Sequence, residues 1–505
     1  MKNNIGLINI LLILIVVAFC VNCSKNKIEE PRPEPLVKIG DVTISKDEFI
    51  RRAEYTIRPV YAKGDLNIHK KIILNSLIAE KLMALEVNGD SLIHTSEYFK
   101  NYLTGRKNQA VRELHYYNLG TRKVKLDPKE VSDIYQKAGR TYQVVFLNLP
   151  AKKAAEEFLK YLDENKISFQ EGIREIMGQK EVPIQEISFD NNDIADIHDI
   201  LFNSPIDKNK IYGPIETLAG EAILFQVKTW KDAKVITDQQ IKQRYNDIKD
   251  KVSRFKAEKI YSEYVSELMR GKKMDFNRET FMRLAALYGK LYDITRENNK
   301  ELMNKEMWGN ERKIQEVDSL KQGFEDLKNA VLFTLEGKEW TVAMFQEELK
   351  SHPLVFRKTK ITGREFPAQF RFAVADLIRD KYITEDAYRK GYDQLKTVND
   401  YTNMWKDNLL SHYYCEKYLF DKGFQGDFEN DYMTAIRDYL NPLVDSLQTK
   451  YSENIWIDTD RFNDISLTKI DLFALQNNVP YPVVVPGFPV ITDDTKLDYG
   501  QKMKD

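Results

Sequence analysis

Hydrophobic residues recur at helical spacing over most of this chain. In residues 68–87, isoleucine and leucine return every three or four positions, which predicts an amphipathic helix with one apolar face. Residues 92–118 continue as a more polar helix. A long, heavily charged helix is expected over residues 237–272, and a second amphipathic helix over residues 367–387. The pattern therefore predicts a mainly α-helical protein.

Two short alternating segments predict strand-turn-helix units. Residues 37–44 alternate as a strand pair, and Ser45 with Glu48 three residues later supplies a capping box for a following helix. A similar order returns at residues 335–345, where a turn glycine again precedes the start of a helix. An amphipathic helix follows each unit. We interpret this echo as an internal duplication.

The pattern changes its period in the middle of the chain. Residues 142–149 are predicted to form a buried strand and residues 151–165 a helix. Further strands are expected at residues 184–189 and 221–228. Because strands and a helix follow one another over a short stretch, this part should form a compact α+β domain inserted between helical segments.

The first residues predict export and a lipid anchor. An apolar run without charged residues covers positions 5–21 and ends near Cys23, which is typical of a secretory signal. The junction resembles a bacterial lipoprotein signal, and this resemblance implies that Cys23 is acylated and begins the mature chain. A retained transmembrane helix is the alternative. Residues 24–35 are polar and proline-rich, so they are expected to form a tether.

Composition limits the chemistry of this protein. A chain of 505 residues exceeds what one core usually serves, and its 76 basic and 77 acidic residues argue against nucleic acid as a partner. Two of the three cysteines lie in the signal region, so Cys415 is left without a disulfide partner. The six histidines lack the spacing of a metal site, and His198 is expected on a helix surface. Neither a metal nor a cofactor is expected.

Short motifs stand near the end of the predicted α+β domain, where Ile200-Leu201-Phe202 is followed by Gly213-Pro214 and then by Gly220. Their order resembles the end of a parvulin domain. Together with the anchor and the strand-turn-helix unit, they resemble the SurA and PrsA group of envelope chaperone-foldases. The resemblance implies a mainly α fold with an inserted α+β domain, in which SurA-like helical chaperone modules flank one parvulin-like domain.

Pattern and resemblance together divide the chain into segments. Residues 478–489 contain too many prolines for a helix or a central strand, and we expect partial disorder there. The expected segments are a signal peptide at 1–22, a lipid anchor and tether at 23–35, an N-terminal helical chaperone module at 36–138, a parvulin-like domain at 139–232, a helical segment completing the chaperone module at 233–329, a second SurA-like helical module at 330–440, and a mixed segment with a proline-rich tail at 441–505.

The resemblance also carries expectations about catalysis. Parvulins isomerise X-Pro bonds, whose barrier is about 18–20 kcal/mol, beside a hydrogen-bonded histidine pair. The corresponding positions here are Gln143 and Ala222, and the resemblance assigns the apolar pocket to Phe146, Ile197 and Phe202. Since alanine offers no side-chain hydrogen bond, we expect little or no isomerase activity and name no catalytic residue.

With no catalytic residue named, the function that remains is binding of other proteins. A chaperone that binds unfolded envelope or outer-membrane proteins needs adaptable apolar surfaces. An active peptidyl-prolyl isomerase and a structural lipoprotein of an envelope assembly are the alternatives. In each case the protein would lie on the periplasmic side of a membrane, held through Cys23. Aromatic candidates for client binding, any of which can equally be core, are Tyr55, Tyr61, Phe99, Tyr102, Tyr116, Tyr117, Phe345, Phe356, Phe366, Phe370 and Phe372.

Overall fold

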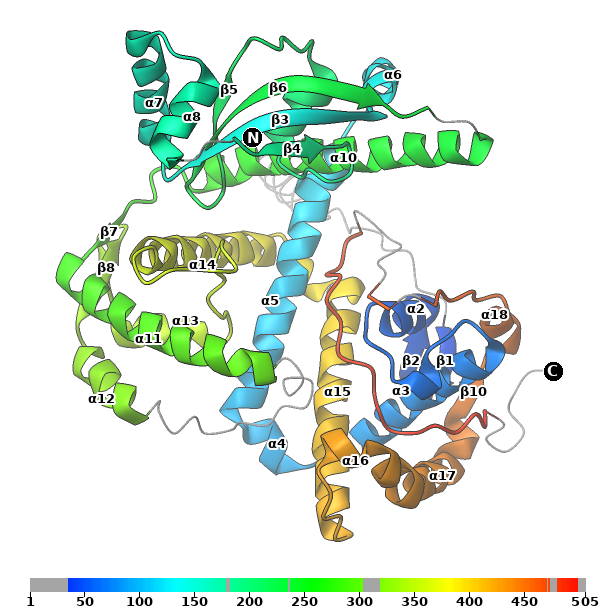
Figure 1. Ribbon diagram of the computed structural model, residues 1–505. Coiled ribbons are helices and arrows are strands. Elements are labelled where there is room, and N and C mark those ends of the chain that lie inside the picture. The colour runs from blue at the N-terminus through cyan, green and yellow to red at the C-terminus, as the bar shows by residue number, and fades with distance from the viewer. Residues whose placement is uncertain are drawn as a thin grey trace, which may run out of the picture.

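The structure is a computed structural model that describes residues 35–178, 182–234, 237–302, 318–469, 471–472 and 479–497. Cys23, the expected signal peptide and most of the expected tether lie outside these residues. The fold is 59% helical with small antiparallel sheets, so the prediction of a mainly α protein with an α+β region is confirmed. In Figure 1, two long helices run through the middle of the molecule, with the other parts around them.

The first strand-turn-helix unit forms as predicted. Strands β1 (Pro35–Ile39) and β2 (Val42–Ser45) pair antiparallel and lead into helix α2 (Lys46–Glu54). The Ser45 hydroxyl accepts a hydrogen bond from the Glu48 backbone N–H at 3.0 Å, which caps the helix. The Glu48 carboxylate does not complete a capping box, because it pairs with Lys81 at 2.8 Å. The local sequence therefore determines the Ser45 cap, whereas tertiary packing determines the partner of the Glu48 carboxylate.

Helix α3 (Asn67–Val87) has the predicted extent but not the predicted exposure. Besides its apolar residues, the side chains of Asn75, Ser76, Glu80 and Lys81 are also buried. The expectation of one apolar face is therefore wrong, because other segments of the chain surround the helix.

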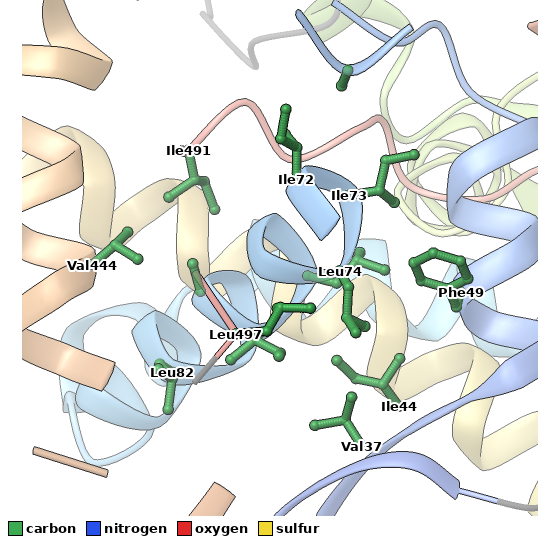
Figure 2. Close-up of a cluster of buried hydrophobic side chains, with 14 of the residues drawn as sticks. Val37, Ile44, Phe49, Ile72, Ile73, Leu74, Leu82, Val444, Ile491 and Leu497 are labelled. Atoms are coloured by element: carbon green, nitrogen blue, oxygen red, sulfur yellow. The ribbon is translucent and has the colours of Figure 1, made fainter. Parts of the chain in front are cut away.

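The end of the chain closes the core around α3. Strand β10 (Ile455–Ile457) pairs antiparallel with β1, and helix α17 (Asn441–Tyr451) packs against α3. The C-terminal strip, which we define as residues 479–497, adds Phe488, Ile491 and Leu497 to the same core. Figure 2 shows Ile491, Leu497 and Val444 of α17 beside side chains of α3.

Two expectations about the end of the chain are therefore corrected. Its described residues 441–497 belong to the core that begins at β1, and the strip is packed instead of disordered. Proline excludes helix and ladder, but it does not prevent neighbouring apolar side chains from entering a core. We call β1, β2, α2, α3, α17, β10, α18 (Thr459–Asn463) and the strip the amino-terminal unit.

The inserted domain is a four-stranded antiparallel sheet in the order β4-β3-β6-β5. The predicted strands and helix are present. Helices α7 and α8 cover one face, whereas α6, α9 and α10 cover the other. Its elements are α6 (Pro128–Lys137), β3 (Arg140–Leu149), α7 (Lys152–Asn165), α8 (Phe169–Met177), β4 (Ile184–Ile187), α9 (Ala195–His198), β5 (Tyr212–Glu216), β6 (Ala222–Asp232) and α10 (Asp238–Leu268).

A second unit repeats the strand-turn-helix order. It has a three-stranded sheet in the order β7-β8-β9 and a core rich in phenylalanine. Helix α11 packs in this core, so the segment 233–329 does not simply complete the first module as expected. The elements are β7 (Met274–Phe276), α11 (Arg278–Leu302), α12 (Asp318–Leu327), β8 (Val331–Leu335), β9 (Lys338–Thr341), α13 (Val342–Leu349) and α14 (Phe366–Arg389).

Two long helices join these parts. Helix α5 (Glu97–Leu119), which follows the short α4 (Ser91–Thr95), contacts α14 of the second unit and α10 of the inserted domain. Helix α15 (Lys396–Asp421) packs against both α5 and α3, and leads to α16 (Phe428–Ala435). Figure 1 shows α5 between the second unit on the left and α15 on the right, with the inserted domain above.

Candidate functional site

The structure does not bring together the two positions expected beside an isomerase pocket. In the β3–β6 ladder, Gln143 lies opposite Thr229, whereas Ala222 lies opposite Leu149. Six residues along a strand correspond to roughly 20 Å. The Gln143 amide instead donates to the Glu186 carboxylate at 3.3 Å. These positions therefore do not form a pair.

The three residues assigned to the apolar pocket lie in the domain core. Ile197 and Phe202 are fully buried, and Phe146 is partly buried with its ring stacked on Phe225 at 5.5 Å between centroids. Ile248 of α10 belongs to the same cluster. Because α6 and α10 close this face of the sheet, Ile197 and Phe202 do not line an open pocket.

His198 is buried, so the expectation of a surface position is wrong. Its ring lies 4.5 Å from the Phe189 ring and 5.1 Å from the Phe255 ring, measured between centroids, and only 3% of the residue is exposed. Burial and the nearby Lys251 ammonium lower the pKa of His198 to about 3. The imidazole is therefore neutral at physiological pH and part of the core.

Cys415 is the one cysteine among the described residues. Its sulfur lies 3.3 Å from the Met83 sulfur, and burial raises the thiol pKa to about 12. Within the described ranges, no cluster of histidine, cysteine and acidic residues could hold a metal ion. No helix within them is long and apolar enough to cross a membrane.

Most aromatic candidates for client binding belong to cores or are only partly exposed. Five of them, Tyr55, Phe99, Phe345, Phe366 and Phe370, are buried. The other six are partly buried: Tyr61, Tyr102, Tyr116, Tyr117, Phe356 and Phe372. Among the eleven, Tyr102 lines a cleft that opens between two parts of the molecule.

This cleft lies between α5 and the segment that follows α13 in the second unit. It encloses about 430 Å³, a volume within the range of ligand pockets. The Gly105 backbone permits the close approach of the two walls, because a Cβ at that position would meet the Ser351 carbonyl oxygen at 2.3 Å. The main lining residues are Tyr102, Arg106, Gln109, Arg112, Leu349, His352, Pro353, Val355 and Asp380.

Arg106 is held by aromatic rings and not by an acid. Its guanidinium lies 3.8 Å from the centre of the Trp405 ring and 5.0 Å from that of Tyr102. It donates hydrogen bonds to the Tyr102 hydroxyl at 3.0 Å and to Gln109 Oε1 at 3.1 Å. Within the described ranges it has no ion-pair partner. A stacked guanidinium with remaining donors is well suited to carboxylate or carbonyl oxygens.

On the opposite wall of the cleft, the negative charge of Asp380 has nearby partners. Asp380 lies 3.1 Å from His352 Nε2 and 3.7 Å from Arg112 Nε, and the Arg112 guanidinium also donates to the Thr384 hydroxyl. Val355, beside them, is 65% exposed. The cleft thus combines apolar lining with one basic group, Arg106, that has no acidic partner among the residues that the structure describes.

A buried polar network fixes the helices that form the cleft. His115 of α5 lies 2.8 Å from the Tyr261 hydroxyl and 2.9 Å from Asp386 Oδ2 of α14. Tyr264 and Lys390 also donate to Asp386. Burial lowers the pKa of His115 against the opposing effect of Asp386. Both ring nitrogens of His115 are occupied, and the network joins α5 to α10 and α14.

A scan against protein-family models and searches of curated proteins and of solved structures found no match. The cleft residues Arg106, Gln109 and Arg112 were not among the predicted site residues. Their spacing along α5 is that of an ordinary solvated helix face, so the sequence carries no signal that the second unit lies against them.

Proposed function

We propose that this protein is a membrane-tethered envelope chaperone that binds extended segments of unfolded envelope or outer-membrane proteins. The supporting observation is the cleft between α5 and the second unit, which is lined by the exposed apolar Val355 and by Arg106 stacked on Trp405. Apolar contacts accommodate varied side chains, and the guanidinium donates hydrogen bonds to backbone carbonyls or to acidic side chains of any sequence. The lipid anchor at Cys23 would keep the cleft near newly exported chains.

The test is suppression of aggregation of an unfolded outer-membrane protein by the chain from Ser24 onward. Val355→Asp places a charge on the apolar lining and should weaken the effect roughly fivefold, since burying an unpaired charge against apolar groups costs about 1 kcal/mol or more. Val60→Asp is the matched control, because Val60 is 84% exposed and lies away from the cleft lining, in the turn between α2 and α3. Equal activity of the two variants would contradict the role of the cleft.

A second assay separates this proposal from its alternatives. Isomerisation of an X-Pro bond in a short peptide should stay at the uncatalysed rate, which takes tens to hundreds of seconds. The separation of Gln143 from Ala222 and the burial of Ile197 and Phe202 support this expectation. Faster isomerisation would favour an active peptidyl-prolyl isomerase. No effect in either assay would favour a structural lipoprotein of an envelope assembly.

A further inference from the structure

The first part of the C-terminal strip is held through its backbone carbonyls. Arg51 donates to the Pro482 carbonyl at 2.7 Å, and the Tyr401 hydroxyl donates to the Val484 carbonyl at 2.8 Å. Arg52 reaches the Gly487 carbonyl at 2.8 Å. These donors come from α2 and α15, and the strip joins no sheet in the described structure. Side chains that donate to carbonyls do not depend on the identity of the residues they hold.

The side chains of this part of the strip differ in exposure. Val485 is 7% exposed and packs among Tyr55, Tyr401 and Trp405. Val483 and Val484 are 48% and 51% exposed. An extended, proline-containing chain against aromatic rings is a known mode of peptide recognition, because its backbone is already ordered before binding.

The two halves of the strip differ in burial. Phe488, Ile491 and Leu497 enter the core around α3 and are at most 5% exposed. In residues 481–485, by contrast, Val483 and Val484 are about half exposed, and the segment is held by α2 and α15. The second half is therefore part of the core, whereas the first half occupies the position of a bound peptide.

We propose that α2 and α15 form a binding groove for extended, proline-containing apolar segments, and that residues 481–485 are its resident occupant. An incoming segment of the same chemistry displaces them while the second half of the strip stays in the core. A tethered occupant acts at a millimolar effective concentration, so outside segments bind weakly while it is seated.

The groove adjoins the cleft through one side chain. Tyr401, which holds the Val484 carbonyl, also lies 3.4 Å from Gln109 Oε1, the acceptor of the Arg106 hydrogen bond. The cleft and the groove are therefore linked through Tyr401. The groove itself does not rest on the proposed function, because its occupant is present whether or not the cleft binds clients.

The experiment measures binding of a fluorescent peptide with the sequence of residues 479–487 to the chain from Ser24 onward. Val485→Asp should unseat the resident segment and increase the affinity for the peptide at least tenfold over the unsubstituted chain. Val483→Asp, the same change at an exposed position of the strip, should leave the affinity unchanged. Adding Tyr401→Phe to Val485→Asp removes one donor and should reduce the affinity roughly fivefold.

Methyl NMR of the unsubstituted chain gives a second measurement that does not require a variant to fold. Millimolar unlabelled peptide should shift the methyl signals of Val485, which is buried when the segment is seated, and leave those of Ile491 and Leu497 unchanged. An unshifted Val485 signal would overturn the proposal. So would a folded Val485→Asp variant that binds no tighter, or one whose affinity does not respond to Tyr401→Phe. Val355→Asp, placed in the cleft, should not change peptide affinity, so this test and that of the chaperone function fail separately.

Discussion

The two strand-turn-helix units share their local construction and differ in how they are closed. In each, a hairpin leads to a helix capped by a hydroxyl, that of Ser45 in α2 and that of Thr341 in α13. Phe49 and Phe345 are both fully buried. A third strand pairs with the first hairpin strand in both sheets, but β7 comes from the preceding segment, whereas β10 comes from the far end of the chain.

The cores behind the two hairpins differ in chemistry. In the amino-terminal unit, Arg52 and Glu80 form a fully buried ion pair with two contacts of 2.6 and 2.8 Å, and Asn408 also donates to Glu80. In the second unit, aromatic rings such as Phe281, Phe345 and Phe370 pack against one another in the core. The comparison teaches that one local pattern can be completed either by distant polar partners or by nearby aromatic residues.

The largest expected difference between the units follows from Glu80→Ala. This change leaves Arg52 buried without its partner, which should lower the free energy of unfolding of the amino-terminal unit by about 3–5 kcal/mol. Native-state hydrogen exchange should show the loss in α3 and not in α14. The double variant Arg52→Leu with Glu80→Leu serves as the control and should lose less. Equal losses in α3 and α14 would contradict a separate closure of the units.

Removing one side chain of the distant strand should have the next largest effect. Ile457 is 1% exposed and lies opposite Val37, so Ile457→Ala should lower the stability of α3 by about 2–5 kcal/mol. The readout is again hydrogen exchange of α3 peptides. A change of less than about 1 kcal/mol would mean that β10 is not needed to close the core.

The helix caps should be equivalent in the two units. Ser45→Ala and Thr341→Ala each remove one capping acceptor and should cost about 1 kcal/mol in their own unit. Chemical denaturation combined with local exchange measures both. A cap that matters in one unit alone would weaken the structural parallel between them.

Mild acid should have the smallest effect and should act on the amino-terminal unit. Burial opposes ionisation of Glu80, but Arg52 outweighs this effect and lowers the pKa of Glu80 below its usual 4.5. The folded state then binds fewer protons than the unfolded state, so stability is present above pH 4.5 and is lost below it. This carboxyl should cost about half a kcal/mol between pH 7 and 4.5, and more at lower pH. In Glu80→Gln that part of the pH dependence should vanish.

The inserted domain shows how far sequence patterns reach. Its strands and first helix follow from alternation and helical spacing within single segments, and they form where predicted. The burial of His198 and Phe202 was not predicted, because it depends on α10, which returns from outside the sheet to cover them. The cleft was missed for the same reason, since it exists only where the second unit meets α5.

The sequence by itself determined the hairpins, the capped helices and the extent of α3, because these depend on residues close together in the chain. Tertiary structure alone decided that β10 and the C-terminal strip close the first core, that Arg52 pairs with Glu80, and that Arg106 stacks on Trp405. The physical reason is that apolar burial and charge pairing do not depend on how close the two partners are in the sequence. Many apolar segments could cover the first core, and many carboxylates could pair with Arg52. Only the packing of the complete chain selects the partner in each case.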